Sequence, residues 1–194
     1  KYGMYYNAEF FGPMFVPLFG FNWKINEHWR LKIVVPVNME LSINNSNFAA
    51  FEQIRLVSEK QQSPGDVQQF VLLYHYPYTD KSQLTKDYLL AKRDSIVKKY
   101  FKGAGEDSYM RTAPADLVPS FEKEVLFKGN YAFEIRGLYS MVNDFRGGPF
   151  VNISVIDEAR KRIITIEGHV FAPKFNKRPY MMELETILNT LSVQ

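Results

Sequence analysis

The stretch that decides the fold is YAFEIRGLYSMVNDFRGGPFVNISVIDEARKRIITIEGHVFA, residues 131–172. Apolar and polar residues alternate within three runs, at 131–142, 149–156 and 162–172, and a period of two is typical of half-buried β-strands. The connections NDFRGG and DEAR are short. The stretch therefore predicts a three-stranded antiparallel meander.

The first connection, within NDFRGGPF at residues 143–150, places Arg146 beside two glycines. This arrangement suggests either a loop that binds an anion or the turn of a hairpin. Asn, Asp and Gly reach positive φ in hairpin turns, and Pro149 suits the first position of the next strand, where a missing N–H is tolerated. A hairpin tip explains every residue except Arg146.

Further elements are predicted before and after this meander in the sequence. Extended runs are predicted at 48–57 and 70–78, a helix at 83–102, a loop at 103–120 with one short strand around SYMRT, and a final helix at 179–193. Strands followed by a helix occur twice, with short connections between strands. We therefore predict an α+β fold, in which a mainly antiparallel sheet carries two principal helices, at about 83–102 and 179–193.

The N-terminal segment differs in composition, because 10 of the first 30 residues are aromatic. Alternation at 15–25 and again at 29–35, around a turn at 26–28, predicts a hairpin. The segment 1–36 resembles a strand pair of bacterial outer-membrane β-barrels, but a barrel needs at least about eight strands. We expect an aromatic-rich hairpin segment at 1–36 that covers an open edge of the core, and a single α+β domain at 37–194.

Composition excludes several classes of protein. With 194 residues, 46% hydrophobic and 23% charged residues, the chain has the composition of a globular domain. The net charge of +3 is spread along the chain, so no nucleic-acid partner is predicted. The chain has no cysteine, and its three histidines lack zinc-ligand spacing. We predict no cofactor and no metal, and we expect the sequence to be a fragment or a processed form because it begins with Lys1.

From about residue 31 to 191 the chain resembles a family of Bacteroidota envelope lipoproteins known only as a domain of unknown function. The resemblance is carried by YHYPYTDKSQLTKDYLLAKRDSI, SYMRT, EIRGLYSMVNDFRGGPF, EGHVFAPKFNKR and LETILNTL. It implies secretion across the inner membrane and an N-terminal lipid anchor that lies outside this chain. Two positions depart from the family pattern, Arg146 in place of methionine and Tyr139 in place of tryptophan, so an anion-binding role of Arg146 is not expected.

The meander also offers a candidate site. Strand alternation is expected to gather polar side chains on one face of the sheet, namely Glu134, Arg136, Ser140, Asn152, Ser154, Thr165, Glu167 and His169. On such a face His169, oriented by Glu167, is a candidate general acid or base, and Arg136 with Glu134 is a candidate ligand-binding pair. The alternative is the solvated side of a half-buried sheet. The basic segments KRDS at 92–95 and KFNKR at 174–178 are interpreted as a solvated helix face and a loop.

Two functions remain open from the sequence, and a third interpretation makes the chain a barrel-associated fragment in which residues 1–36 pack poorly on the rest. The first function is a non-catalytic module of the cell envelope that binds a small ligand or another envelope protein. The second is a small hydrolase-like enzyme that uses Arg136, Glu167 and His169. The family resemblance places the protein in the periplasm or at the outer membrane, with membrane association only through the lipid anchor.

Overall fold

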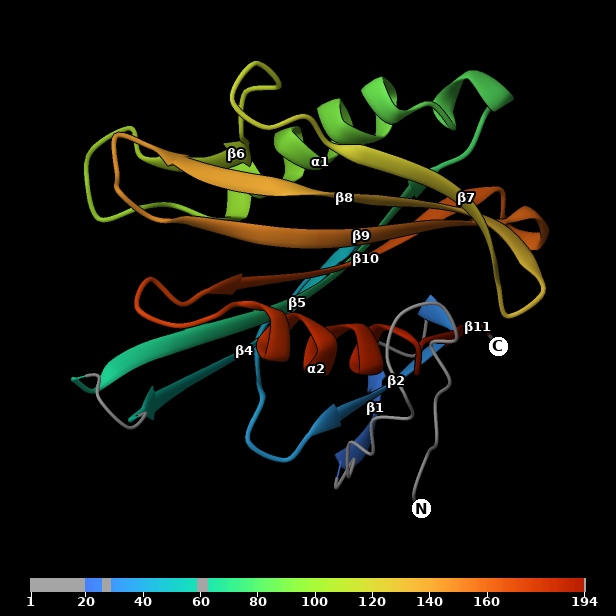
Figure 1. The fold of residues 1–194 in the computed structure, drawn as a ribbon. Helices are drawn as coiled ribbons and strands as arrows, with labels where there is room; N and C mark the ends of the chain where they lie inside the picture. The colour runs from blue at the N-terminus through green and yellow to red at the C-terminus, as the bar shows by residue number, and fades with distance from the viewer. Residues whose placement is uncertain (1–19, 26–28, 59–62, 194) are drawn as a thin grey trace.

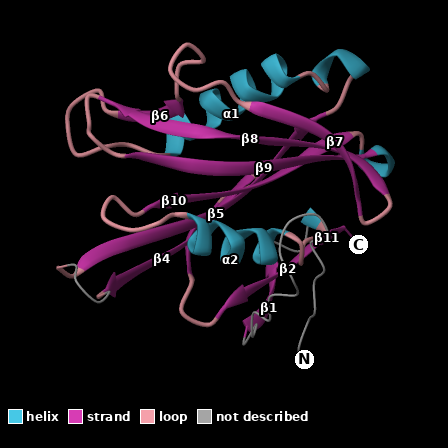
Figure 2. Ribbon diagram, in the orientation of Figure 1, coloured by secondary structure: helices cyan, strands magenta, loops and turns pink. Residues whose placement is uncertain are grey.

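The fold is that of a computed structural model, which describes residues 20–25, 29–58 and 63–193 (Figure 1). Strands make up most of it, with one helix at each side of the large sheet (Figure 2). The elements are β1 Gly20–Ile25, β2 Leu31–Pro36, β3 Glu40–Asn44, β4 Phe48–Val57, β5 Gly65–Pro77, α1 Lys86–Tyr100, β6 Tyr109–Thr112, β7 Phe121–Phe127, β8 Asn130–Val142, β9 Gly147–Asp157, β10 Arg162–Phe171, α2 Arg178–Leu188 and β11 Ser192–Val193. The predicted α+β class is confirmed.

The large sheet has the order β3-β4-β5-β10-β9-β8-β6, and β7 pairs with β8 beside β6. All of these neighbours are antiparallel. Helix α1 lies against β6 on one face, and α2 packs on β10 and β5 on the other. The curled sheet therefore has two covered faces, each with its own hydrophobic core (Figure 1).

The predicted meander is confirmed as β8, β9 and β10. Its first connection is a hairpin tip, in which Asn143 has a φ of 53° and the Met141 N–H donates to the Arg146 carbonyl at 2.9 Å. Strand β9 already begins at Gly147, so Pro149 is its third residue and not its first. Gly148 is required for space, because a Cβ there would collide with the carbonyl oxygen of Val170.

The N-terminal hairpin is built into the main core. Strand β1 pairs with β2, and β2 also pairs with β11 at the end of the chain. The side chains of Leu31, Ile33 and Val35 are buried in the cluster that includes α2. The segments 1–19 and 26–28, which include the predicted turn, lie outside the described residues, and a domain boundary at residue 36 stays a prediction.

The bounds of both helices differ from the predicted ones. Asp80 caps a short 3₁₀ turn, Lys81–Gln83, and Thr85 caps α1 one turn later. Helix α2 ends at Leu188 and not at residue 193, because the Thr190 hydroxyl bonds to both the N–H and the carbonyl of Val34 in β2. This contact turns the chain into β11. Within the described part of the chain, neither helix is long and apolar enough to cross a membrane.

Three strands were not predicted: β3, β7 and β11. Strand β7 has four exposed residues in a row at 121–124 and a run of charges, so its sequence lacks the apolar alternation of a half-buried strand. Strand β11 has only two residues and exists through its pairing with β2.

We expect Gly148→Ala to destabilise the fold by about 1–3 kcal/mol or more, because the new methyl group must displace the backbone of β10. The matched control is Gly105→Ala, whose Cβ would lie 3.5 Å from the nearest heavy atom, the Asn143 carbonyl oxygen. Urea unfolding of both variants measures the difference. Equal stability of the two variants would show that β9 and β10 are not packed this closely.

Candidate functional site

A row of polar side chains runs across the middle strands of the sheet beneath α1. Residues directly opposite each other in antiparallel strands share a face, and Asn152 lies opposite both Ile135 and Glu167. The members of this buried polar row are Tyr74 in β5, Thr165, Glu167 and His169 in β10, and Asn152 and Ser154 in β9. All six side chains are shielded from solvent, so the row is internal and not a solvated sheet face.

Hydrogen bonds connect five of the six members of the row, all except His169. The Asn152 amide nitrogen donates to Tyr74 Oη and to Glu167 Oε2, both at 3.2 Å. The Ser154 hydroxyl lies 3.2 Å from Asn152 Oδ1 and 2.9 Å from Thr165 Oγ1. The neutral side chains of Tyr74, Asn152, Ser154 and Thr165 therefore have partners inside the row, as buried polar groups require.

Arg93 of α1 supplies the charge that this row needs. Its Nε and Nη2 donate to the two oxygens of Glu167 at 2.8 and 2.7 Å, in a two-pronged ion pair with no exposure on either side chain. The remaining N–H groups reach Asp94, Thr112 and the sulfur of Met110. All five donors of the guanidinium therefore have partners.

The same helix turn ties α1 to β6. The Asp94 carboxylate accepts from the backbone N–H of Thr112 at 2.8 Å and from its hydroxyl at 2.7 Å. The guanidinium carbon of Arg93 also lies 4.0 Å from the centre of the Phe150 ring in β9. Arg93 therefore joins the helix to the edge strand β6 and to the central strands β9 and β10.

Burial and pairing act in opposite directions on these charges. Burial alone would raise the pKa of Glu167, but the nearby Arg93 guanidinium outweighs it and lowers that pKa well below its usual range. Burial would likewise lower the pKa of Arg93, while the Glu167 carboxylate raises it. Both side chains are therefore charged at neutral pH.

His169 ends the row and is enclosed by rings. Its imidazole stacks on Phe70 at 4.8 Å between centroids and meets Phe101 and Tyr139 edge-on at 5.4 and 5.1 Å. Nδ1 lies 3.5 Å from Glu167 Oε1, too far for a well-formed hydrogen bond, and neither ring nitrogen has a hydrogen-bond partner. Burial lowers the pKa of His169, Arg93 adds to this effect, and Glu167 opposes it, so the ring is neutral at pH 7.

The other two predicted site residues lie on the opposite face. Glu134 pairs with Ile153 in the sheet, and Ile153 belongs to the core on the α2 side, so the Glu134 side chain points to that side. Arg136 donates to Glu134 at 2.6 Å and to both oxygens of Glu185 in α2 at 2.6 and 3.1 Å. The expectation that Arg136 shares a face with Glu167 and His169 is wrong.

The residue that the sequence analysis missed is Arg93. The prediction that KRDS forms a solvated helix face is wrong at this position, because Arg93 has 0% exposure. A signal was present in the sequence: Arg93 follows Leu89 by four residues and precedes Val97 by four, so it falls within the apolar stripe of the helix. A cation within such a stripe indicates a buried partner, and Glu167 in the predicted meander was the candidate.

Arg93 and Glu167 are charged, but neither side chain is exposed to solvent, and the same is true of His169. No group of three or more His, Asp and Glu side chains in the described part of the chain is arranged to bind a metal ion. Arg93 beneath α1 and Arg136 on the α2 face are each held by carboxylates. The polar chemistry of both faces is therefore used for internal pairing.

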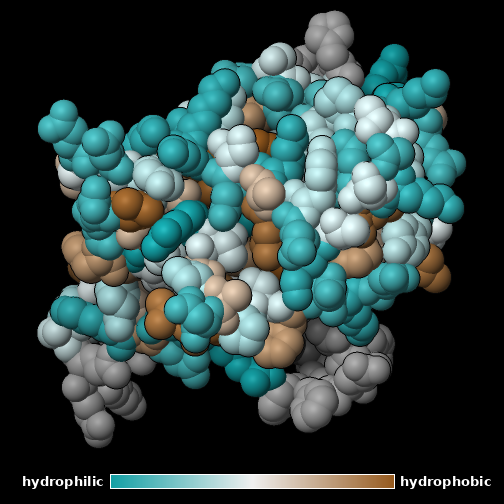
Figure 3. Space-filling view, turned by 90° about the horizontal axis from the view of Figure 1, so that it is seen from above, coloured by the Kyte–Doolittle hydropathy of each residue, from teal (hydrophilic) through white to brown (hydrophobic). Residues whose placement is uncertain are grey.

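An exposed apolar surface lies at one end of the α1 face. We call it the distal strip and define it by Ile54 and Leu56 of β4, Phe70 of β5, Phe145 of the hairpin tip and Phe171 of β10. Ile54, Leu56 and Phe145 are 61%, 72% and 87% exposed, and the Phe145 and Phe171 rings are 6.1 Å apart. Viewed from above, hydrophobic side chains emerge among hydrophilic ones at the left of Figure 3. Phe70 connects the strip to His169.

Arg146, the unexplained cation of the sequence analysis, pairs with Asp144 beside Phe145 of this strip. Its backbone N–H, Nε and Nη2 donate to the Asp144 carboxylate at 3.1, 3.0 and 2.7 Å. Hydrogen bonding to Arg146 lowers the pKa of Asp144. The two partners of the ion pair stand on either side of Phe145 in the hairpin tip, where the Phe145 side chain is exposed.

Comparisons with known proteins agree with this fold. The family described as a domain of unknown function (DUF4837) matches residues 20–190. Among solved structures, the Ran-binding protein Mog1p of Saccharomyces cerevisiae is 9% identical with a TM-score of 0.52, over 91% of this chain and 96% of that one. A point mutant of Mog1 gives 9% identity and a TM-score of 0.50, over 90% and 95% of the two chains. At this identity the likeness shows the fold alone. No functionally curated protein matches the sequence.

We expect Arg93→Met to cost about 3–5 kcal/mol of unfolding free energy, because it leaves the Glu167 carboxylate buried without its partner. The double variant Arg93→Met/Glu167→Leu is expected to recover most of this loss, since apolar side chains replace both charges. The matched control is Arg136→Met, which breaks a partly exposed ion pair on the α2 face, with an expected cost of about 1 kcal/mol or less. Urea unfolding at pH 7 measures all three, and equal costs for the two single variants would contradict the assigned roles.

His169 is expected to make stability depend on pH. Its pKa is lower in the folded protein than the ordinary value of 6.5, so the unfolded chain takes up a proton first as the pH falls. Stability is therefore full above about pH 6.5 and declines below it, by at most about 1.4 kcal/mol per pH unit for one group.

The variant His169→Phe removes this group and fills the space between the surrounding rings. We expect a shallower loss of stability between about pH 6.5 and pH 5 than in the wild type. Burial also lowers the pKa of His75, so this second histidine contributes to the pH dependence in the same direction. The variant His75→Phe measures that contribution separately. An unchanged slope in His169→Phe would mean that the pKa of this imidazole is not lowered in the folded protein.

Proposed function

The chain belongs to the family described as a domain of unknown function (DUF4837), and we propose that it is a non-catalytic module of the cell envelope that binds a protein partner. One observation carries the proposal: the distal strip leaves large apolar side chains exposed, with Leu56 at 72% and Phe145 at 87%. Several large apolar side chains exposed at one end of a molecule are characteristic of an interaction site.

The strip is preorganised for binding. Phe145 stands between the two partners of the Asp144–Arg146 ion pair, and Ile54 and Leu56 stand on a regular strand. Rigid presentation of apolar groups reduces the entropy lost on association. A protein surface is the partner that fits such a strip, since aromatic and aliphatic anchors dominate binding energy at protein interfaces.

The polar residues favour binding over catalysis. A general base must reach the proton that it abstracts, whereas His169 has 0% exposure and lies beneath Phe70 and Phe101. Glu167 is neutralised by Arg93, and Arg136 by Glu134 and Glu185. These pairings support a structural use of the charged groups.

The alternative is a small hydrolase-like enzyme. One observation favours it, the pair of unpartnered nitrogens on His169 beside the Glu167 carboxylate. Arg136 no longer belongs to that hypothesis, because its side chain lies on the other face of the sheet. The enzyme requires Phe70 and Phe101 to part, so a small-molecule substrate would perturb the NMR signals of the His169 ring.

The cell-envelope location rests on the resemblance to Bacteroidota envelope lipoproteins. The fold relative Mog1p is a Ran-binding protein, and that description supports protein binding as a use of this fold without naming the partner here. Fractionation of cells that produce the full-length protein tests the location, and recovery in the cytosol would contradict it.

Site-specific crosslinking tests the proposed binding. We would replace Leu56 or Phe145 with a photoreactive benzoylphenylalanine and illuminate the cells that produce the protein. The two positions are expected to yield the same adduct, because both lie in the distal strip. The control position is Leu126 of β7, which is 79% exposed outside the strip. Equal adducts from all three positions, or none from 56 and 145, would contradict a partner at the strip.

A further inference from the structure

The outer edge of β4 is open over half of its length. Strand β3 pairs with β4 only from Ala49 to Glu52, whereas β5 pairs with β4 as far as Val57. Among the described residues, no strand pairs with the outer side of β4 beyond Glu52. Every second residue of a strand directs its N–H and C=O to a given side, so the segment Gln53–Val57 presents backbone groups in strand geometry to a partner.

This edge lacks the features that normally prevent strand pairing. Edge strands are commonly blunted by short length, bulges, proline or lysine. Strand β3 is protected in this way, since it has five residues and its register with β4 shifts between Leu41 and Ile43. In contrast, Gln53–Val57 has a regular register with β5 and contains neither proline nor lysine. Its one charged side chain, Arg55, is engaged by Gln69 and Glu183 at 2.6 Å each.

The two faces of the open edge differ in chemistry. On the α1 side stand Ile54 and Leu56, 61% and 72% exposed. Carboxylates flank them on that side, because Glu52 precedes Ile54 by two residues and Asp66 lies opposite Leu56. A segment added to the edge would therefore place apolar residues on the α1 side and would meet repulsion there if it carried acidic ones.

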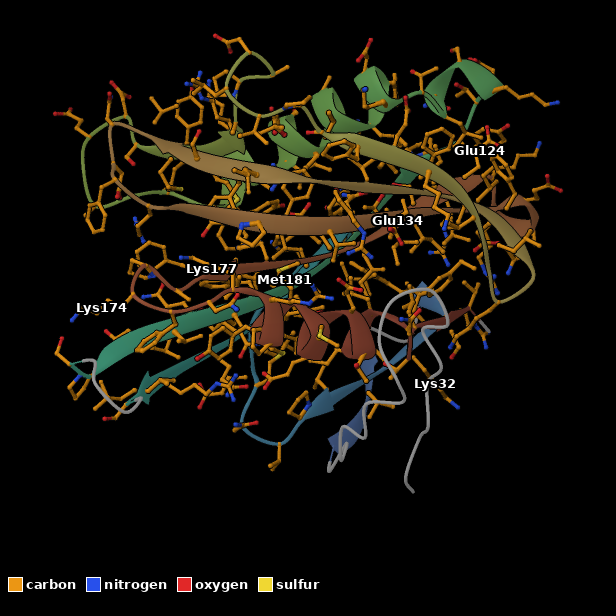
Figure 4. The ribbon with its side chains drawn as sticks, in the orientation of Figure 1. Lys32, Glu124, Glu134, Lys174, Lys177 and Met181 are labelled. Atoms are coloured by element: carbon orange, nitrogen blue, oxygen red, sulfur yellow. The ribbon has the colours of Figure 1, made fainter. Side chains whose placement is uncertain are left out.

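The α2 side of the same edge is positive. The Arg55 side chain points to this side and is one-third exposed. The Lys174 Nζ lies 3.0 Å from Ser63 Oγ and 3.2 Å from the Pro64 carbonyl oxygen, just before β5 begins. Figure 4 shows Lys174 at the end of the molecule where β4 and β5 meet. Glu183 balances Arg55, so Lys174 leaves this side with a net positive charge.

We propose that the open edge of β4 binds an extended segment of a partner protein by strand addition, and that this segment alternates apolar with acidic residues. The apolar residues lie beside Ile54 and Leu56, and the acidic residues lie on the side of Arg55 and Lys174. Backbone hydrogen bonds supply affinity in this mode of recognition, and alternate side chains supply specificity. The inference rests on the proposed function and deepens it, because it states how the partner is held.

A synthetic probe tests the strand addition. We would titrate the full chain with a fluorescein-labelled peptide of six residues in which valine and glutamate alternate. Two controls have matched length: one replaces each glutamate with lysine, and the other has the same composition in the order VVVEEE. We expect the alternating acidic peptide to bind about tenfold or more tightly than either control, since only it matches both faces of the edge.

N-methylation of the probe separates strand addition from simple adhesion to apolar side chains. In an antiparallel pair, alternate amides of the added strand point toward β4 and away from it. Two peptides, methylated on one or the other set of amides, should therefore differ: one loses binding and the other retains it. If both bind like the parent peptide, strand addition is wrong, while a protein-binding distal strip stands.

Two variants test where on the protein the peptide binds. Leu56→Lys adds a charge to the open edge and is expected to weaken peptide binding about tenfold or more. Leu126→Lys is the matched control, on the exposed surface of β7, and should leave binding unchanged. Unfolding curves of both variants verify that they fold. Equal binding by both variants, or a wild-type chain that forms dimers broken by Leu56→Lys, would overturn the proposed occupant.

Discussion

The ion pair between Arg93 and Glu167 is the contact on which the arrangement of this domain depends. A buried carboxylate in the central strand β10 is tolerated only with a cation of good geometry beside it, and α1 supplies that cation with all five donors satisfied. The position of α1 along the sheet follows from this requirement. A shift of α1 by one turn, about 5 Å, would separate the two charges.

The two faces of the sheet use their polar side chains differently. The α1 face encloses a hydrogen-bonded polar row that ends at His169, and the α2 face carries the ion pairs of Arg55 and Arg136 with Glu183 and Glu185. The charged groups of these pairs are thus bound by partners within the protein, either in the interior or at the surface. What remains available to a partner is the uncovered end of the sheet, where β4 extends past β3 and the hairpin tip carries Phe145.

The two predicted site pairs show how far alternation along a strand can be used. Within β10 the period of two correctly placed Glu167 and His169 on one face, and it also placed Asn152 with them. It failed between β8 and β9, where the register sets Glu134 opposite Ile153 and so puts even positions of one strand beside odd positions of the next. A change of one residue in register moves every side chain to the other face, and the register depends on the geometry of the hairpin tip.

By itself the sequence determined the α+β class, the meander, the residue limits of β4 and the existence of both helices, because these follow from local periodicity and turn residues. Only the tertiary structure decided that Arg93 is buried against Glu167, that Arg136 lies on the opposite face, and that Thr190 ends α2 by bonding to β2. These features depend on contacts between residues 49 to 156 positions apart. Such contacts arise from the packing of complete elements, which no local pattern of residues specifies.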